Sequence, residues 1–582
     1  MEKVDNIYRN VYTGLVDETY AGKEVRVCGW INSIRKLGGL TFVTLRDETG
    51  ILQITTEDAS LFENINREST VSIVGDVKLR EPNMVNENMK TGKVELTPKS
   101  VEVLGEALNV LPFEISRSKE EASEETRLKY RYLDLRNPKV HDNMAFRFKV
   151  IDHIRGLMKS MDFTEISTPI ITTSSPEGAR DFIIPSRKYK GKFYALPQAP
   201  QIYKQLLMVS GFNRYFQIAP CFRDEDCRAD RTLEFYQLDL EMSFVTEEDV
   251  YKVGEKIFYD IFTTFSDKYV SPYPFRRIAY KDAMLMYGSD KPDLRNPLII
   301  SELTNIFKNT SFEPFKNSIV RGIKVSNIEK SNSWFKSMEE YAKTIGMAGL
   351  SYLKVEEDLN LKGSLSKYLS EEEVSALISE LELKPKDVLF IISDKKKCEK
   401  YAGLIRTKLG EELDLIDKDR FEFCIVNDFP FYEWNEEDNK WDFAHNPFSM
   451  PQGGIEALNS ADPGSIVAYQ YDFVCNGCEM ASGAVRNHSI EIMKKAFEIA
   501  GYDEEVVKTK FKSLYTAFQY GAPPHAGMAP GIDRIIMLLT GEENLREVQI
   551  FPPNVSGQDL LMGGPTEVTE QQLRETHLKI RD

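Results

Sequence analysis

The sequence predicts a multidomain α+β protein that begins with a small β-barrel. Its 582 residues correspond to about three or four domains. Five short strand patterns fall within residues 24–110, where turn residues such as Gly38-Gly39 separate them. A strand, a charged loop and a second strand follow over residues 222–241, and a long helical pattern runs from about residue 143 to residue 161. Together these patterns favour an α+β chain.

The composition excludes several classes of protein. Hydrophobic residues make up 42% of the chain, which is enough for several cores. No apolar run approaches the length of a membrane span, and the first five residues lack the apolar core of a signal peptide. The seven cysteines have no regular spacing, which indicates a reducing, cytoplasmic setting. The net charge of −17 disfavours bulk coating of nucleic acid, although local basic patches remain compatible with RNA contact.

The first 110 residues are expected to form an OB-fold barrel. The strand patterns cover residues 24–34, 40–47, 52–56, 70–78 and 93–103. Barrels of this kind commonly bind single-stranded nucleic acid. Arg35, Phe42 and Gln53 are candidate RNA contacts, because Phe42 lies on a strand beside a basic turn, as a base-stacking residue would. The alternative is that Phe42 packs inside the barrel.

The stretch over residues 222–241 carries the strongest chemical signal. Its loop is too densely charged for any core to bury. In the second strand, Gln237, Asp239 and Glu241 share one face with Phe235, and Tyr236, Leu238 and Leu240 share the other. Polar side chains on the inner face of a strand indicate that this face contacts a polar group rather than a hydrophobic core. The alternative is a solvated hairpin at the edge of a sheet.

Two interpretations are open for the segment that ends at Glu479. Cys475 and Cys478 form a C-x-x-C pair, which suggests zinc or redox chemistry. However, a second cysteine or histidine pair at suitable spacing is missing from the sequence, as is the βαβ context of a redox motif. Asp472 and Glu479 are instead expected at the ends of two strands, across an Asn-Gly turn. Their hard oxygen atoms suit Mg²⁺ that bridges ATP phosphates.

A glycine-rich stretch over residues 521–534 precedes an apolar helix. Its glycines allow a ligand to approach the backbone closely, and Arg534 stands at the start of the helix. The stretch lacks the Gly-Lys-Ser/Thr of a P-loop and the Gly-x-Gly-x-x-Gly of a dinucleotide-binding turn.

These stretches resemble the motifs of class II aminoacyl-tRNA synthetases. Phe222-Arg223-Asp224-Glu225 resembles the opening of motif 2, and its continuation to Arg231 resembles the form in bacterial aspartyl-tRNA synthetases. Residues 163–171 resemble motif 1, which builds the dimer interface, and residues 521–534 resemble motif 3. Cys28-Gly29-Trp30 and residues 37–42 resemble the anticodon-binding barrel of the same family. The chain departs from residues common in that family at Ser33, Ala199, Thr232 and Asn446.

The resemblance implies a five-part organisation with a catalytic domain built on an antiparallel sheet flanked by helices. The expected parts are an OB-fold anticodon-binding domain (1–110), a hinge (111–142), the first catalytic part with motifs 1 and 2 (143–293), an inserted α/β domain of the bacterial, GAD-like type (294–418) and the second catalytic part with motif 3 (419–582). The inserted segment is rich in Lys and Glu and has no dense cluster of catalytic residue types, so no chemistry is assigned to it.

The resemblance also implies roles for individual residues. Arg223 and Arg534 are the expected catalytic residues, with Arg223 on the phosphoryl group that gains charge and Arg534 on the γ-phosphate. Aspartate binding is expected from Glu177, Gln201, Lys204, Arg223, Asp239, His445 and Arg486. ATP binding is expected from Arg223, Asp224, Glu225, Phe235, Glu479, Gly531, Ile532, Asp533 and Arg534, with Mg²⁺ on Asp472 and Glu479. Anticodon contacts are expected from Arg35, Phe42, Gln53 and Glu95.

The function that the resemblance implies is that of a homodimeric, cytoplasmic aspartate–tRNA ligase without membrane association. It would convert L-aspartate and ATP to aspartyl-adenylate and pyrophosphate, and then transfer aspartate to the 3′-terminal adenosine of tRNA(Asp). The alternative is a ligase that charges both tRNA(Asp) and tRNA(Asn). Because the α-carboxylate is already ionised at neutral pH, the reaction needs no general base and depends on positioning and charge neutralisation.

Three rival functions fit the residues less well. A lysyl enzyme needs acids that face a substrate ammonium, whereas Lys204 and Arg486 are cations. An asparaginyl enzyme should not need both cations. An RNA-binding protein without catalysis would leave Arg223, Glu479 and Arg534 unexplained.

Overall fold

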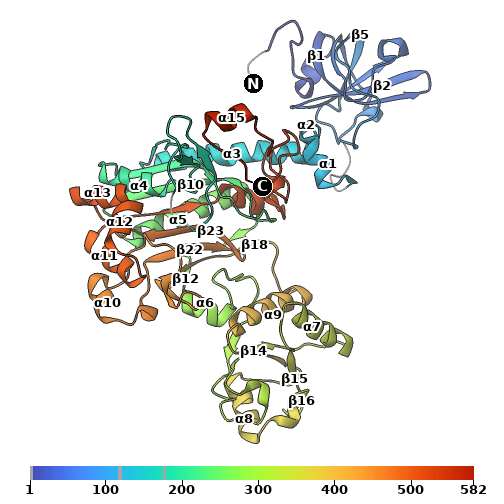
Figure 1. The fold of residues 1–582 in the computed structure, drawn as a ribbon. Coiled ribbons are helices and arrows are strands. Elements are labelled where there is room, and N and C mark those ends of the chain that lie inside the picture. The colour runs from blue at the N-terminus through green and yellow to red at the C-terminus, as the bar shows by residue number, and fades with distance from the viewer. Residues whose placement is uncertain (1–3, 116–120, 175–177, 582) are drawn as a thin grey trace. The chain divides into compact units, whose positions relative to one another are not determined.

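The computed structural model describes residues 4–115, 121–174 and 178–581, which belong to two compact units, Met1–Pro138 and Lys139–Asp582. Figure 1 shows the elements of both units. Across the described ranges, none of the helices combines the length and the apolar character that a membrane crossing requires.

The first unit contains a closed five-stranded barrel, which confirms the barrel predicted from the strand patterns. The strand order is β1 (Glu24–Leu37), β2 (Leu40–Asp47), β3 (Gly50–Thr56), β5 (Val94–Gly105) and β4 (Thr70–Leu79). Alternate residues such as Val27, Val43 and Ile54 fill its interior and are fully buried. Two short helices follow, α1 (Glu124–Lys129) and α2 (Arg131–Asp134).

The second unit is organised around an eight-stranded sheet. Its order is β12 (Arg276–Ala279), β19 (Phe423–Asn427), β22 (Gln470–Cys475), β23 (Cys478–Val485), β24 (His525–Pro530), β10 (Glu234–Ser243), β9 (Arg214–Phe222) and β6 (Thr164–Glu165). The pairs from β19 to β9 are antiparallel, and the outer strand at each end is parallel to its neighbour. The predicted antiparallel catalytic sheet is therefore confirmed.

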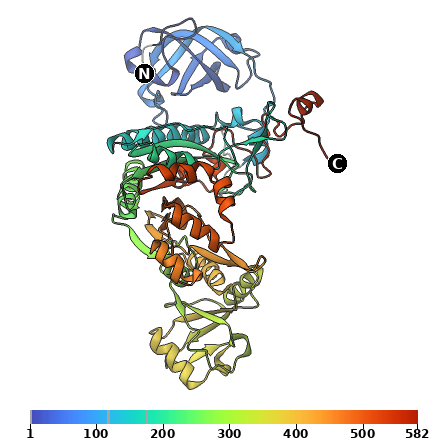
Figure 2. The same ribbon diagram turned by 60° about the vertical axis from the view of Figure 1, so that its left-hand side comes forward.

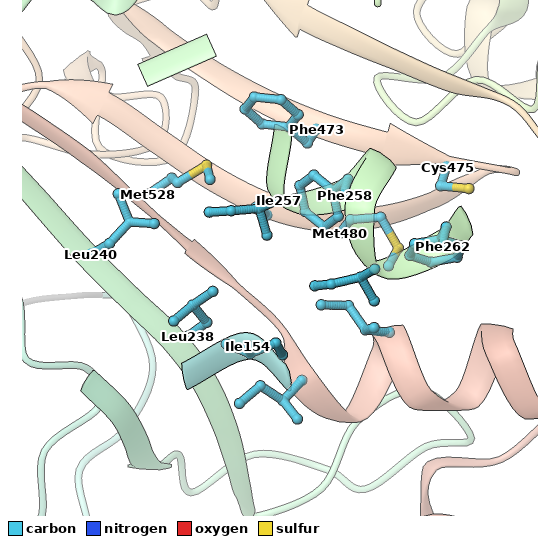
Figure 3. Close-up of a cluster of buried hydrophobic side chains, with 14 of the residues drawn as sticks. Ile154, Leu238, Leu240, Ile257, Phe258, Phe262, Phe473, Cys475, Met480 and Met528 are labelled. Carbon is cyan, nitrogen blue, oxygen red and sulfur yellow. The ribbon is translucent and has the colours of Figure 1, made fainter. Parts of the chain in front are cut away.

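One face of this sheet is apolar and packs on helices α3 (Pro138–Ser160), α5 (Glu247–Phe265) and α14 (Ile532–Thr540). Figure 3 shows Leu238 and Leu240 of β10 and Met528 of β24 in the same cluster as Ile154 of α3 and Phe258 of α5. Because side chains alternate along a strand, Asp239, between Leu238 and Leu240, points to the opposite face. That face is left for polar side chains.

The segment of residues 163–171, which resembles motif 1, forms a strand only in part. Only Thr164–Glu165 pair, as β6 at the edge of the sheet beside β9. Pro169 cannot donate a backbone hydrogen bond, so it does not extend the ladder.

Smaller elements surround the sheet. The strand pairs are β7 (Ile183–Pro185) with β8 (Phe193–Ala195), β11 (Tyr269–Val270) with β18 (Arg420–Phe421), and β20 (Tyr432–Asn435) with β21 (Lys440–Phe443). The remaining helices here are α4 (Gln201–Val209), α6 (Tyr280–Tyr287), α10 (Gly454–Ser460), α11 (Ile490–Ile499), α12 (Glu504–Lys510), α13 (Lys512–Ala517) and α15 (Glu570–Glu575).

The chain between α6 and β18 forms a second sheet with its own helices (Figures 1 and 2). The strand order is β13 (Ile300–Glu302), β14 (Ile319–Val325), β17 (Val388–Asp394), β15 (Ser351–Val355) and β16 (Leu361–Gly363). Helices α7 (Asn332–Thr344) and α9 (Cys398–Glu412) contribute to the apolar cluster on one face, and α8 (Glu371–Glu380) contributes to the cluster on the other.

A glycine allows β24 to pair with β10 beside the Glu241 side chain. Gly527 is paired with Glu241, and a Cβ atom at this position would clash with the Glu241 carboxylate and with the carbonyl oxygen of Leu240. We therefore expect Gly527→Ala to lower the free energy of unfolding by about 1–3 kcal/mol, the usual effect of overpacking. Urea denaturation measures this change. Gly156→Ala is the matched control, because a Cβ atom there, on α3, meets open space; equal midpoints for the two variants would contradict the prediction.

Candidate active site

A cavity of about 810 Å³ lies over the polar face of the eight-stranded sheet. Its lining residues come from segments that precede the inserted sheet in the sequence and from segments that follow it. The predicted site residues that line it are Gln201, Lys204, Arg223, Glu225, Phe235, Asp239, His445, Asp472, Glu479, Arg486, Gly531, Asp533 and Arg534. Its volume is in the range of small-molecule sites in proteins.

Two other predicted residues that the structure describes, Asp224 and Ile532, do not line this cavity. Asp224 lies on the loop between β9 and β10, where its carboxylate is 3.9 Å from Nε of Arg180. The side chain of Ile532 is fully buried in the hydrophobic core, and the expected part of this residue in ATP binding stays a prediction. Glu177 lies outside the described residues.

Four buried charged side chains form one network, which we call the floor of the cavity; Lys204, Asp239 and Arg486 line the cavity, whereas Glu241 does not. Nζ of Lys204 is 2.6 Å from Oδ1 of Asp239 and 3.4 Å from Oε2 of Glu241. Nε of Arg486 donates to Oε1 of Glu241 at 2.8 Å, and Nη2 donates to Oε2 at 3.1 Å. The two cations and two carboxylates therefore neutralise one another in a region from which water is excluded.

Arg486 is predicted to pair with a carboxylate of the substrate. In the structure its guanidinium also binds a carboxylate of the protein, that of Glu241. Glu241 binds the guanidinium by two nitrogens, which leaves Nη1 as the nitrogen not engaged by this carboxylate. Burial raises the pKa of Glu241, but the facing charges of Arg486 and Lys204 bring this pKa below its ordinary value. Glu241 is thus an ionised positioning residue that sequence reasoning missed, although its place on the polar face of β10 was a signal.

Two atoms beside this network are buried without a partner in the described part of the protein. They are Nε2 of Gln201, on α4, and Oδ2 of Asp239. Buried polar atoms are normally hydrogen-bonded, so an unpaired donor and an unpaired acceptor in one cavity indicate a place for a ligand. A small ligand with both an ammonium and a carboxylate group matches this arrangement.

Asp472 and Glu479 are brought together by a bulge rather than by the strand ends. The Asn-Gly turn joins Cys475 to Cys478, and Asp472 lies within β22, where it pairs with Ser482. The register shifts by one residue after Phe473, so that Glu479 pairs with Val474. Met480 is the extra residue of this bulge. It places the side chain of Glu479 on the same face of the sheet as that of Asp472. The prediction that Asp472 ends its strand is wrong, but the expected proximity of the two acids is found.

The two carboxylates fit a magnesium ion that a phosphate ligand helps to hold. Oδ1 of Asp472 is buried and lacks a hydrogen-bond partner among the described residues. Burial and the neighbouring charge of Glu479 raise the pKa of Asp472 well above its ordinary value. A nearby cation would stabilise the ionised form. Within the described ranges no three acidic, His or Cys side chains converge as a complete metal cage, so phosphate oxygens and water would complete the coordination, as is usual for Mg²⁺.

The two predicted catalytic arginines occupy one side of the cavity. The guanidinium carbon of Arg223 lies 5.0 Å from the ring centre of Phe235, and its buried Nε has no hydrogen-bond partner in the described chain. Nη1 of Arg534 donates to the backbone carbonyl of Glu479 at 2.8 Å. Both guanidinium groups can donate to anionic oxygens from fixed positions.

Asp533 and His445 border the cavity with more limited roles. One carboxylate oxygen of Asp533 accepts from Arg147, and the other accepts from Gln549 and from the backbone of Tyr236. These bonds tie α14 to α3 and β10, and the ATP contact of Asp533 stays a prediction. Burial lowers the pKa of His445, so that its imidazole is neutral at pH 7.

The predicted anticodon residues share the outer face of the barrel. Phe42 pairs with Arg35 on β1 and is half-buried, whereas its neighbour Val43 is fully buried. The alternative that Phe42 belongs to the core is therefore wrong. Nε2 of Gln53 donates to Oε2 of Glu95 at 3.2 Å, so these two polar groups are positioned together.

Comparisons with known proteins agree with both units. A family model described as tRNA synthetases class II (D, K and N) matches residues 123–555, and one described as OB-fold nucleic acid binding domain matches residues 25–104. The chain is 50% identical to an aspartate–tRNA(Asp/Asn) ligase of Rickettsia canadensis, over 98% of this chain and 97% of the relative. It is 49% identical to one of Ehrlichia chaffeensis, over 99% of each chain.

A solved structure resembles the fold. Asparaginyl-tRNA synthetase from Pyrococcus horikoshii, complexed with asparaginyl-adenylate, matches with a TM-score of 0.57 and 20% identity. The match covers 94% of this chain and 98% of that chain. At this identity the likeness supports the fold alone.

The charge network predicts a large effect of one neutral substitution. We expect Glu241→Gln to lower the free energy of unfolding by about 3–5 kcal/mol, because it leaves buried cations without their counter-charge. Glu248→Gln is the control, since Glu248 pairs with Arg277 at the exposed surface, where such a pair contributes about 0–1 kcal/mol. Urea denaturation at pH 7 compares the variants.

The same comparison has a predicted pH dependence. Because the pKa of Glu241 is lowered in the folded protein, its stabilisation is present above the ordinary pKa of glutamate and is lost as pH falls through the folded value. The difference between wild type and Glu241→Gln should therefore shrink in acid. A difference that grows as pH falls would show that Glu241 is not held ionised.

Proposed function

The chain belongs to the class II tRNA synthetases of the D, K and N group, and we propose that it is an aspartate–tRNA ligase that charges both tRNA(Asp) and tRNA(Asn). Relatives about half identical over nearly the whole chain are named as ligases for both tRNAs. The family resemblance seen in the sequence is confirmed. Of its two expected specificities, these relatives favour the broader one.

One observation carries the proposal for the catalytic site. Four buried atoms that line the cavity lack hydrogen-bond partners in the described chain, and they are two donors and two acceptors: Nε2 of Gln201, Nε of Arg223, Oδ2 of Asp239 and Oδ1 of Asp472. A ligand set with anionic oxygens at one end and an ammonium group at the other satisfies all four, directly or through a metal ion. Aspartate together with ATP has this chemistry.

The floor of the cavity supports selection of an acidic amino acid. Lys204 and the free edge of Arg486 can hold a side-chain carboxylate, and Oδ2 of Asp239 can accept from the substrate ammonium. Asparagine presents a neutral amide, whose oxygen is a weaker acceptor for the Lys204 ammonium and for Nη1 of Arg486 than an ionised carboxylate is. Lysine would bring a third cation to them. Both substrates are therefore disfavoured.

The chemistry uses the other side of the cavity. The aspartate α-carboxylate attacks the α-phosphorus of ATP, a new carboxyl–phosphorus bond forms, and the bond to pyrophosphate breaks. Arg223 stabilises the charge on the α-phosphoryl oxygens, Arg534 holds the γ-phosphate, and Phe235 stacks on the adenine. Mg²⁺ on Asp472 and Glu479 would neutralise phosphate charge when bound. The 3′-terminal hydroxyl of tRNA then attacks the mixed anhydride and releases AMP.

The barrel and the edge of the large sheet support the remaining parts of the proposal. Phe42 offers a half-exposed ring to a base of the anticodon, between Arg35 and the Gln53–Glu95 pair. Ile170 and Ile171 are exposed large apolar side chains in the segment that resembles motif 1, as a homodimer interface requires.

Amino-acid activation and tRNA charging test the proposal directly. We expect ATP–pyrophosphate exchange that depends on aspartate and is weak with asparagine or lysine. Purified transcripts of tRNA(Asp) and tRNA(Asn) should both accept radiolabelled aspartate. If only tRNA(Asp) accepts aspartate, the enzyme is specific for tRNA(Asp) and the proposal of dual specificity is wrong. If pyrophosphate exchange does not depend on aspartate, the chain is not an aspartate–tRNA ligase.

The two catalytic arginines should fail in different ways. Arg223→Lys loses bidentate contact with a group that gains charge in the transition state, so adenylate formation should slow by about 10²–10³-fold with a smaller loss of ATP affinity. Arg534→Lys should mainly weaken ATP binding, because its γ-phosphate partner is present before the reaction. Single-turnover kinetics at saturating and limiting ATP separates the two effects. A near-normal rate of Arg223→Lys at saturating ATP would remove its transition-state role.

A further inference from the structure

A lysine that no predicted role includes reaches the carboxylates of the cavity. Lys291 follows α6, in the segment of residues 288–298 that leads into the inserted sheet. Its Nζ lies 3.1 Å from Oε2 of Glu479 and 3.4 Å from Oδ2 of Asp290, and both Asp290 and Lys291 line the cavity. A charged side chain from this connection is thus part of the catalytic cavity.

Lys291 and Arg534 bind the two oxygens of one carboxylate. Arg534 lies 3.6 Å from Oε1 of Glu479, opposite the oxygen that Lys291 contacts. A lysine side chain ordinarily carries a positive charge at neutral pH. Two cations therefore stand at the carboxylates that would meet the phosphates of ATP.

We propose that Lys291 binds the β- and γ-phosphates of ATP, and that the inserted domain fixes it in that position. This inference rests on the proposed use of ATP. When phosphates lie beside Glu479, their oxygens carry more negative charge than one carboxylate does. Lys291 is therefore attracted more strongly to the phosphates than to Glu479. An ammonium on a flexible stem can reach them with a small movement of its end. AMP has neither of these phosphates, so Lys291 discriminates ATP from AMP.

Helix α9 of the inserted domain holds the backbone that carries Lys291. The buried guanidinium of Arg406 donates to three carbonyl oxygens of this segment, those of Asp293 (3.0 Å), Asn296 (2.7 Å) and Leu298 (2.6 Å). The side chain of Asn296 donates in return to the carbonyl of Arg406 at 2.9 Å. A segment with this many charge-assisted bonds to one side chain has little freedom to move independently of α9.

Two glycines complete the attachment. Gly288 ends α6 in a left-handed conformation, and Gly403 of α9 lies directly against it. A Cβ atom at Gly403 would clash with the carbonyl oxygen of Gly288. A side chain at this helix position would therefore displace the segment three residues before Lys291, without touching the cavity.

Equilibrium binding by isothermal titration calorimetry, with Mg²⁺ in the buffer, tests the proposal. Lys291→Met should weaken ATP binding by about 10–100-fold, the effect of losing a hydrogen bond to a charged group, and should leave AMP affinity within about twofold. Lys291→Arg keeps the charge and should bind ATP within about tenfold of wild type. Lys281→Met is the matched control, because Lys281 is exposed on α6, outside the cavity lining.

The role of the inserted domain is tested by a double-mutant cycle. Gly403→Ala should weaken ATP binding more than AMP binding, and it should add little to Lys291→Met, because both changes remove the same contact. Equal losses of ATP and AMP in Lys291→Met, or unchanged or tighter ATP binding, would overturn the phosphate role. Unchanged ATP affinity in Gly403→Ala would overturn the role of α9. Absence of ATP binding by the wild type would instead overturn the proposed function itself.

Discussion

The contact between the buried side chains of Glu241 and Arg486 joins the two halves of the catalytic sheet. Glu241 belongs to β10, before the inserted domain, and Arg486 follows β23, after it, so that 245 residues separate the partners. Neither charge is tolerable in this position without the other. The two hydrogen bonds to Glu241 fix the orientation of the Arg486 guanidinium. Lys204 contacts Glu241 as well, and it also pairs with Asp239. The polar floor thus exists only when both halves of the sheet have assembled.

The same constraint explains how a large insertion is compatible with an accurate site. The inserted sheet has its own apolar clusters on both faces, so it does not depend on the catalytic core for burial. It leaves the main sheet after α6 and returns at β18, near one edge. The strands that carry Asp239, Asp472 and Glu479 are hydrogen-bonded to strands of the main sheet, independently of the insertion. The segment with Lys291 connects the insertion to the cavity.

Local patterns in the sequence predicted the elements and many of the site residues, but not their partners. Alternation along β10 is enough to place Asp239 and Glu241 opposite Leu238 and Leu240. It cannot show that Glu241 would engage Arg486, because that pairing depends on the order of strands. Spacing alone also could not reveal the bulge that aligns Glu479 with Asp472. Asp533 was assigned to ATP by resemblance, although its oxygens are occupied by groups from three other segments. The barrel was the most predictable part, because three of its five strand pairings join strands that are consecutive in the sequence.

The lengths of the outer strands have a consequence for solubility. A sheet edge with free backbone groups can pair with another chain and start aggregation. The barrel is closed and therefore has no such edge. The eight-stranded sheet ends in β12, which has four residues, and in β6, which has two. Edges this short offer few backbone groups in register to an incoming strand, and Pro169 follows soon after β6. A sheet whose buried side chains include charged residues is thereby protected from pairing with other chains at its edges.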